Sequence, residues 1–148
     1  MWADTLQQAE RLHLLRLCLW GGLTTLAGTT LLVFAYARAV RPILVVRFGW
    51  VCGSLGLVEL LTGLFAYRGV ALRDVASATR LDRMAWLQLG LFLGLMGVGV
   101  TLALTSRVIK VASAEFHSAS LAGGGIAVAL HGLALATLEL LLIAQVSR

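Results

Sequence analysis

The sequence predicts an all-α integral membrane protein, folded as a bundle of four transmembrane helices. Three observations predict this class. Of the 148 residues, 59% are hydrophobic and only 13% are charged, and the mean hydropathy is +0.92, which is too apolar for an ordinary soluble domain. Four apolar runs are each long enough to cross a bilayer as a helix. The short alternating segments of a membrane β-barrel are absent from the sequence, and its 16 Gly fit closely packed helices.

Four spans follow one another within a single transmembrane domain that covers residues 1–148. They lie at about residues 16–38, 43–67, 84–106 and 119–146. Pro42 closes the turn between the first two, because proline cannot continue a helix. The stretch 68–83 carries four Arg and two Asp, and we expect it to be the longest polar connection, with room for a short surface helix.

The residues before the first span have the pattern of an amphipathic helix. Apolar residues recur at helical spacing on one side of this segment, at Leu6, Ala9, Leu12 and Leu15. Polar residues occupy the opposite side. We expect this segment to lie at the membrane interface and to run without a break into the first span. Trp20 and Tyr36 lie near the ends of that span, where aromatic residues commonly anchor helices.

The net charge of +5 comes from basic residues near the ends of the spans. They form no block suited to nucleic acid, so lipid headgroups are their expected partners. An even number of spans puts both termini on one side of the membrane. Seven Lys and Arg fall on that side against five on the other, an excess that favours cytoplasmic termini.

A shift of the chain by 69 residues superposes several Gly and Arg residues. The matched pairs are Arg11 with Arg80, Gly21 with Gly90, Gly28 with Gly97, Arg38 with Arg107, Gly56 with Gly125 and Gly63 with Gly132. Each half would then be a helical hairpin, and two tandem copies would be related by an axis along the membrane normal. A chain this rich in Leu, Ala and Gly also gives such matches by chance.

Small residues one turn apart are typical of close helix packing in lipid, because they let two backbones approach. Such pairs are Gly49 with Gly53, Gly90 with Gly94, Gly125 with Ala129 and Gly132 with Ala136. The simplest interpretation is packing within the bundle. The alternative is that one face, formed by Gly94, Gly97 and Thr101, docks onto a helix of another protein, and the sequence alone does not decide between the two.

Polar residues inside the predicted spans are the candidate functional site, because such residues are costly to bury in lipid without a partner. Glu59 and His131 fall near the middle of helices that run in the same direction, so we expect a hydrogen bond or ion pair between them. Glu139 lies about 12 Å further along the fourth helix. That position is at the level of Gln88 and within reach of Arg16, which predicts a second polar layer.

These polar residues admit two main interpretations. They could be interhelical contacts that hold the helices in register. They could instead surround a water-filled cavity that carries protons or ions, with Glu59, His131 and Glu139 along the path.

His131 admits a further interpretation as the ligand of a tetrapyrrole. Ala127 lies one turn before it, which leaves room beside the imidazole for a metal-bound macrocycle. Haem ligation by two His is disfavoured, because His13 and His117 belong near opposite membrane surfaces. A quinone is the other cofactor considered, and the sequence requires neither.

The sequence contains no arrangement typical of an enzyme or of a metal site. It has no set of Ser, His and Asp and no cluster of Cys and His. It has no phosphate-binding loop either, because the glycines at 123–125 lie inside an apolar run. We therefore predict no catalytic residues, no metal and no enzymatic activity.

Two motifs carry a resemblance to a known family. The fourth span contains Gly-Ile-Ala-Val-Ala-Leu-His-Gly at 125–132, followed by Leu133, Leu135, Leu138 and Glu139, and the first contains Leu-Trp-Gly-Gly-Leu at 19–23. They resemble an uncharacterised bacterial family of small four-span membrane proteins, whose members carry Gln in place of His131 and Asp in place of Glu139. The second span departs from that family, because it lacks the expected His and Asn. The resemblance implies a four-span fold in the bacterial inner membrane and no particular activity.

The function expected from these features is that of a non-catalytic structural or accessory subunit, or assembly factor, of a larger membrane complex. We expect that complex to be bioenergetic, respiratory or photosynthetic. The sparse intramembrane polar groups and short loops favour partners among membrane lipids and other transmembrane subunits. The alternative is a small ion- or proton-coupled transporter or channel, active as a homo-oligomer because four spans leave little room for a central path. A pigment-binding or quinone-binding protein is the third interpretation.

Overall fold

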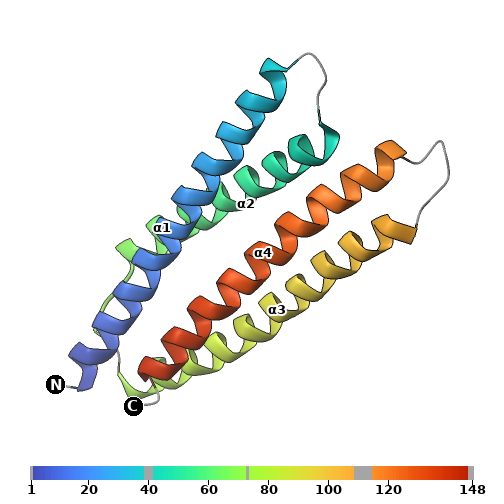
Figure 1. Cartoon of the computed structure of the whole chain (residues 1–148). Coiled ribbons are helices and arrows are strands. Elements are labelled where there is room, and N and C mark those ends of the chain that lie inside the picture. The colour runs from blue at the N-terminus through green and yellow to red at the C-terminus, as the bar shows by residue number, and fades with distance from the viewer. Residues whose placement is uncertain (1, 39–41, 73, 109–114, 147–148) are drawn as a thin grey trace.

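The chain folds into four helices that form two hairpins (Figure 1). The computed structural model describes residues 2–38, 42–72, 74–108 and 115–146. Its elements are α1 (Trp2–Ala37), α2 (Ile43–Arg68), α3 (Val75–Val108) and α4 (Glu115–Val146). No strand occurs in the described ranges, and each helix is long and apolar enough to cross a membrane. The predicted all-α class with four helices of membrane-spanning length is confirmed. Four basic residues used in the orientation argument lie outside the described residues: Arg41, Arg73, Lys110 and Arg148.

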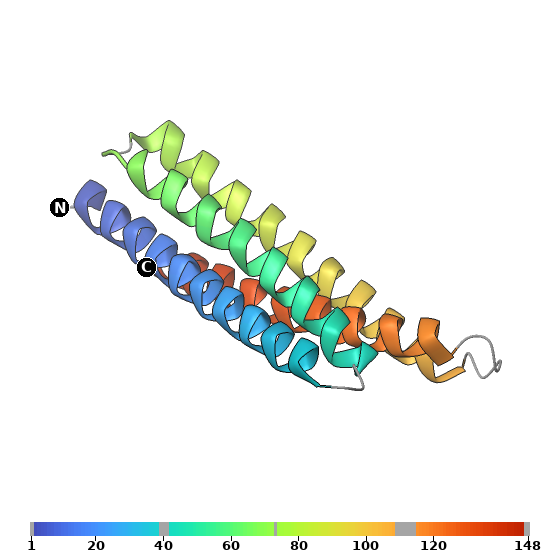
Figure 2. The same ribbon diagram turned by 90° about the horizontal axis from the view of Figure 1, so that it is seen from above.

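The two helices of each hairpin pack against each other, and α4 joins the two hairpins. α1 pairs with α2 and α3 pairs with α4, while α4 also packs against α2 and, over a shorter length, against α1. Figure 2 shows the last turns of α1 and α3 and the first turns of α2 and α4 at the end of the bundle opposite the termini. In the most apolar stretch of α4 44% of the residues are buried, against 11% for α3. α4 is therefore the central helix and α3 the most peripheral.

α1 is one helix of 36 residues, so the lead-in continues into the first span as predicted. The predicted apolar face of the lead-in packs on the bundle only in part, through the buried Leu6 and Ala9. Leu12 and Leu15 are 41% and 45% exposed, whereas the polar residues Glu10 and His13 are buried. Ala9 belongs to an apolar cluster with residues of α3 and α4. The first turns of α1 therefore pack onto the bundle through a face that includes polar side chains.

α3 begins earlier than the sequence predicts. Its first residue is Val75 rather than a residue near 84, so the expected long polar connection is reduced to 69–74. Asp74 accounts for this early start, because its carboxylate accepts the backbone N–H of Ser77 at 2.9 Å and the Ser77 hydroxyl at 2.6 Å. This is an N-cap, which satisfies a donor that the first helical turn leaves free. The charged residues that follow therefore belong to the first turns of α3.

Replacing Asp74 by Ala should loosen the first turn of α3. The hydrogen bonds from the hydroxyl and backbone of Ser77 lower the pKa of Asp74 from its ordinary value of 3.8. Because the folded-state pKa is lowered, the cap contributes fully above pH 3.8 and is lost as the pH falls through the folded-state pKa. We expect faster amide hydrogen exchange at the start of α3 in Asp74→Ala than in wild type at neutral pH. Equal exchange in the two proteins would show that Asp74 does not cap the helix.

The backbones of paired helices approach closely at small residues. A Cβ added at Gly28 of α1 would lie 2.5 Å from the Gly53 nitrogen and 2.7 Å from the Gly49 oxygen of α2. In the second hairpin, Gly99 of α3 meets the backbone of Gly125 and Ala129 of α4 in the same way. The predicted pairs Gly49 with Gly53 and Gly125 with Ala129 therefore do pack within the bundle.

The other two predicted pairs behave differently from each other. A Cβ added at Gly132 would lie 2.5 Å from the Met96 nitrogen, and Ala136 is buried in the apolar cluster, so this pair also packs within the chain. At Gly90 and Gly94 no heavy atom of another element lies within 4 Å of an added Cβ. The interpretation of Gly90 and Gly94 as contacts within the bundle is therefore wrong.

The two hairpins use equivalent contacts, and on α2 and α4 these keep the predicted offset of 69 residues. The predicted pair Gly56 and Gly125 lie against the backbones of Gly21 and Gly99 respectively. On α1 and α3 the offset differs, because Gly99 follows Gly21 by 78 residues. The 69-residue shift instead matches Gly28 with Gly97, which faces open space. The two halves are alike as hairpins, and the residues that the sequence matched on α1 and α3 are not structural equivalents.

Candidate functional site

A buried polar contact forms where α1, α2 and α4 meet. The predicted hydrogen bond is present, with His131 Nδ1 2.7 Å from Glu59 Oε1. When Nδ1 carries the proton, the imidazole donates to the carboxylate. His131 is completely buried and Glu59 is 8% exposed. Because both side chains are buried, leaving either of them without its partner would be costly.

Trp20 of α1 completes this contact instead of anchoring the helix at an interface as predicted. Its ring meets that of His131 edge to face, with ring centroids 5.9 Å apart and planes inclined by 70°. Because α1 begins at Trp2, Trp20 lies at the middle of the helix, level with His131 in the middle of α4. Its indole N–H is buried and has no hydrogen-bond partner in the described part of the chain. Trp20 is therefore part of the polar centre.

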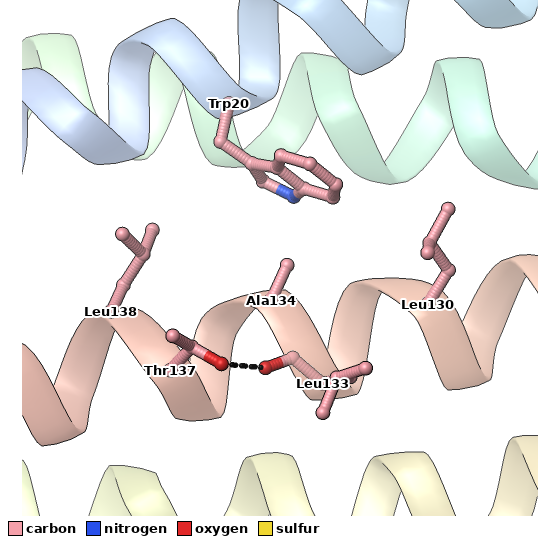
Figure 3. A pocket seen from close by; sticks show the side chains of 6 residues that line it. All are labelled: Trp20, Leu130, Leu133, Ala134, Thr137 and Leu138. Carbon is pink, nitrogen blue, oxygen red and sulfur yellow. Dashed lines mark hydrogen bonds between the residues drawn. The ribbon is translucent and has the colours of Figure 1, made fainter.

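A shallow apolar groove lies between α1 and α4 beside this centre. Figure 3 shows Trp20 pointing from α1 toward α4, above Ala134 and between Leu130 and Leu138. The groove has a volume of about 370 Å³. Its one hydroxyl, that of Thr137, donates to the carbonyl of Leu133 within α4 at 2.8 Å. The groove therefore offers a ligand little beyond apolar surface and the indole N–H.

A second polar contact joins α1 and α4 nearer the termini. His13 Nε2 lies 3.5 Å from Glu139 Oε1, and His13 Nδ1 lies 3.3 Å from the Leu138 carbonyl oxygen. Glu139 is only 3% exposed. The predicted second polar layer exists, but its partner for Glu139 is His13. Arg16 makes no contact with Glu139 among the described residues, and its Nη1 is buried without a partner.

Sequence reasoning missed His13, which we expected near a membrane surface. The signal that identifies it is the helical period of α1, because His13 lies four residues after the buried Ala9 and seven before Trp20. Residues at these intervals share one side of a helix. Continuing the helix through the predicted start of the first span places His13 on the side of Trp20, facing α4.

A cavity of about 450 Å³ opens among all four helices on the terminal side of the contact between Glu59 and His131. Its walls are mainly apolar. The polar residues that line it are Glu10, His13, Glu59, Thr62, Gln88 and Glu139. Gln88 and Glu139 thus border one space, as their predicted common level requires. The two polar contacts of the bundle therefore belong to a single cavity.

The polar lining does not continue past His131 toward the other end of the bundle. From Leu121 to Leu130 α4 consists of Gly, Ala and apolar residues, and Gly123 meets the backbone of Leu44 and Phe48 on α2. The hydroxyls of Thr24, Thr25 and Thr29 on α1 donate to carbonyls of their own helix. Among the described residues the polar groups that line the cavity therefore end at the contact between Glu59 and His131, an arrangement that suits binding better than passage through the bundle.

The surroundings of His131 do not fit a tetrapyrrole. The Nδ1 atom is occupied by Glu59, Trp20 packs against the ring edge to face, and Nε2 is buried although it has no hydrogen-bond partner among the described residues. A macrocycle needs open space at the ligating nitrogen, and this ring has none. A quinone would have to bind in the cavity instead. Among the described residues no group of three His, Cys, Asp or Glu could hold a metal ion.

Comparisons with family models, with characterised proteins and with solved structures each find no match for this chain. The resemblance to the bacterial family of small four-span membrane proteins therefore stays a prediction from its motifs. His131 and Glu139, two of the residues that carry the resemblance, are both in polar contact with other helices. Any function has to be inferred from this arrangement itself.

Proposed function

We propose that this chain is a non-catalytic accessory subunit or assembly factor of a larger membrane complex, bound through α3. The observation that carries the proposal is a row of three glycines on α3, Gly90, Gly94 and Gly97, called here the α3 glycine face. At none of them does another element come within 4 Å of an added Cβ. Their spacing places them on one side of the helix, and the exposed Thr101 extends that side by one turn.

The contrast with the other helical glycines supports a missing partner. Gly28 and Gly99 each lie against the backbone of a neighbouring helix. Glycine in the middle of a helix costs roughly 0.5–1 kcal/mol relative to alanine. That cost is offset where the absent side chain lets two helices approach closely in lipid. The α3 glycine face carries the cost three times without such an approach, and a docked helix would provide it.

The partner that fits this face is an apolar transmembrane helix. α3 is the least enclosed helix, and large apolar side chains such as Trp86 and Leu91 are more than half exposed on it. A helix with small residues at the contact could approach α3 as closely as α4 does on its other side. We propose a bioenergetic complex of the bacterial inner membrane as the assembly, with the termini of this chain in the cytoplasm.

Replacing Gly94 by Leu should weaken partner binding by about tenfold, which corresponds to ~1.4 kcal/mol. Gly22→Leu is the matched control, because Gly22 on α1 has the same open space around it. The measurement is purification of the full chain from gently solubilised native membranes, with mass spectrometry of the co-purified chains and an absorption spectrum. We expect stoichiometric partners with wild type and Gly22→Leu and their loss with Gly94→Leu. A homo-oligomer without partners, or equal recovery with both variants, would reject the proposal.

Ion- or proton-coupled transport is a second candidate, favoured by the alignment of polar residues along one cavity. Glu59 and Glu139 both line it, and each is paired with a His of another helix. If these residues carry protons, Glu59→Gln and Glu139→Gln should each abolish flux into liposomes that contain the purified chain. An accessory subunit should retain its partners in both variants. Flux that is equal in wild type and in both variants would exclude this candidate.

A further inference from the structure

We infer that the cavity among the four helices binds a hydrophobic organic cation, a molecule with an ammonium-type head and an apolar body. This inference does not depend on the docking of α3. The cavity has a volume of about 450 Å³. That value falls in the range of roughly 300–1,000 Å³ that is usual for small-molecule sites. Its mainly apolar walls would contact the body of such a ligand, and its few polar groups would hold the head.

Two carboxyl groups in the wall of this cavity each have one oxygen without a hydrogen-bond partner among the described residues. Glu59 and Glu139 line it and are both more than nine-tenths buried. Their Oε1 atoms are paired with His131 and His13 respectively, whereas both Oε2 atoms are buried without any partner among the described residues. A buried acceptor without a donor is unfavourable, so both oxygens would gain from a donor or a positive charge on a ligand.

The charged groups around the cavity favour one sign of charge on the ligand. Every helix contributes one or two polar side chains to the wall: α1 brings Glu10 and His13, α2 Glu59 and Thr62, α3 Gln88 and α4 Glu139. Among the described residues no Lys or Arg lines the cavity; Arg16, whose charge acts on His13, lies outside the wall. An anion would therefore meet carboxyl groups and no Lys or Arg in the described wall, whereas a cation would be attracted by the carboxylates. The electrostatics of the site thus favour a positively charged ligand.

The spacing of the carboxyl groups favours an organic cation over a metal ion. Glu59 contacts His131, and Glu139 follows His131 by eight residues on the same helix. Eight residues of α-helix span about 12 Å, which is too far for both carboxylates to bind one metal ion. One carboxylate can hold the head of a larger molecule while its apolar body occupies the space between. The leucines that line the cavity suit that body.

The mouth of the cavity lies where a hydrophobic ligand could enter from the lipid. α2 and α3 both line the cavity, yet they pack against each other weakly at most. Thr62 of α2 and Gln88 of α3 border it and are exposed. The opening is therefore lateral, between these two helices, and a ligand dissolved in the membrane would reach the carboxylates through it.

The inference is tested with two probes of the same shape and opposite charge, tetraphenylphosphonium and tetraphenylborate. Binding to the full chain in mild detergent is measured by equilibrium dialysis, with protein-free micelles as the blank. We expect saturable binding of the phosphonium and none of the borate. Losing a hydrogen bond or ion pair to a charged group typically weakens binding by about ten- to a hundredfold, which is the loss expected for Glu139→Gln.

Three further variants separate the site from general effects on folding. Thr62→Trp should also weaken phosphonium binding, because the indole would block the mouth without changing any charge. Asp82→Asn removes a carboxylate of α3 outside the cavity and should bind like wild type, as should Gly94→Leu, which tests only the α3 glycine face. Equal binding of the two probes, or unchanged affinity in both Glu139→Gln and Thr62→Trp, would overturn the inference.

Discussion

Replacing Gly28 by Ala is expected to lower the free energy of unfolding by about 1–3 kcal/mol, the usual cost of overpacking a close contact. An added Cβ would lie 2.5 Å from the Gly53 nitrogen and 2.7 Å from its Cα. These are backbone atoms, so no side-chain rotation can relieve the overlap, and α1 would have to move away from α2. Unfolding by a denaturing detergent in mixed micelles would measure the loss.

Gly97→Ala is the matched control for this prediction. The 69-residue shift pairs Gly97 with Gly28, but Gly97 has open space around it. Alanine is the better helix former by about 1 kcal/mol, so this variant should be as stable as wild type or slightly more stable. If both variants lose the same stability, the packing of α1 on α2 described here is wrong and the 69-residue repeat is the better guide.

The contact between Glu59 and His131 could be predicted from the sequence because it depends on depth alone. Each residue is the one strongly polar group near the middle of its apolar run, and the two helices run in the same direction. Two polar groups that are costly to bury and lie at the same depth must form a hydrogen bond with each other or with water. The number of helices and their order follow from the apolar runs for a similar reason, since length and composition decide them.

The faces of the helices could not be predicted, because all sides of these helices are apolar. In water, polar residues mark the outer face of a helix, but in lipid the exposed and buried sides have similar composition. Gly28 and Gly97 therefore look alike in the sequence, although one contacts a helix and the other does not. The sequence does not identify His13 for a related reason, because the predicted first span begins after this residue.

The start of α3 could in principle be predicted from the sequence. Asp74 and Ser77 have the spacing of an N-cap residue and its third helical residue, a local signal that does not depend on packing. Hydropathy instead predicts that the charged residues after them belong to a connection between helices. In the structure these charges lie on the first turns of α3, and local capping chemistry rather than hydropathy fixes where the helix begins.

Replacing His131 by Leu is expected to lower the free energy of unfolding by about 1–3 kcal/mol, the cost of leaving a buried polar group without its partner. Glu59 Oε1 would lose its 2.7 Å contact, and the Oε2 atom already has no partner in the described part of the chain. Glu59→Leu should cost a similar amount, because it leaves Nδ1 of the buried imidazole unpaired. The double variant Glu59→Leu with His131→Leu should be close to wild type, because it removes both polar groups and keeps apolar volume.

The double-mutant cycle decides whether this pair exists to hold the helices together. Coupling energies for polar pairs between transmembrane helices average about 0.6 kcal/mol and reach roughly 1.7. Two single losses of about 1 kcal/mol each, with a double variant close to wild type, correspond to a coupling energy of about 2 kcal/mol. The low exposure of both residues therefore places the single losses at the lower end of the stated range and the coupling near the upper known value. Additive losses would show that the two side chains are not coupled. If the double variant is stable and still binds tetraphenylphosphonium, the pair serves helix packing. If it is stable and no longer binds that probe, Glu59 is in the bundle because the cavity needs its carboxylate, and His131 is there to hold that carboxylate in place.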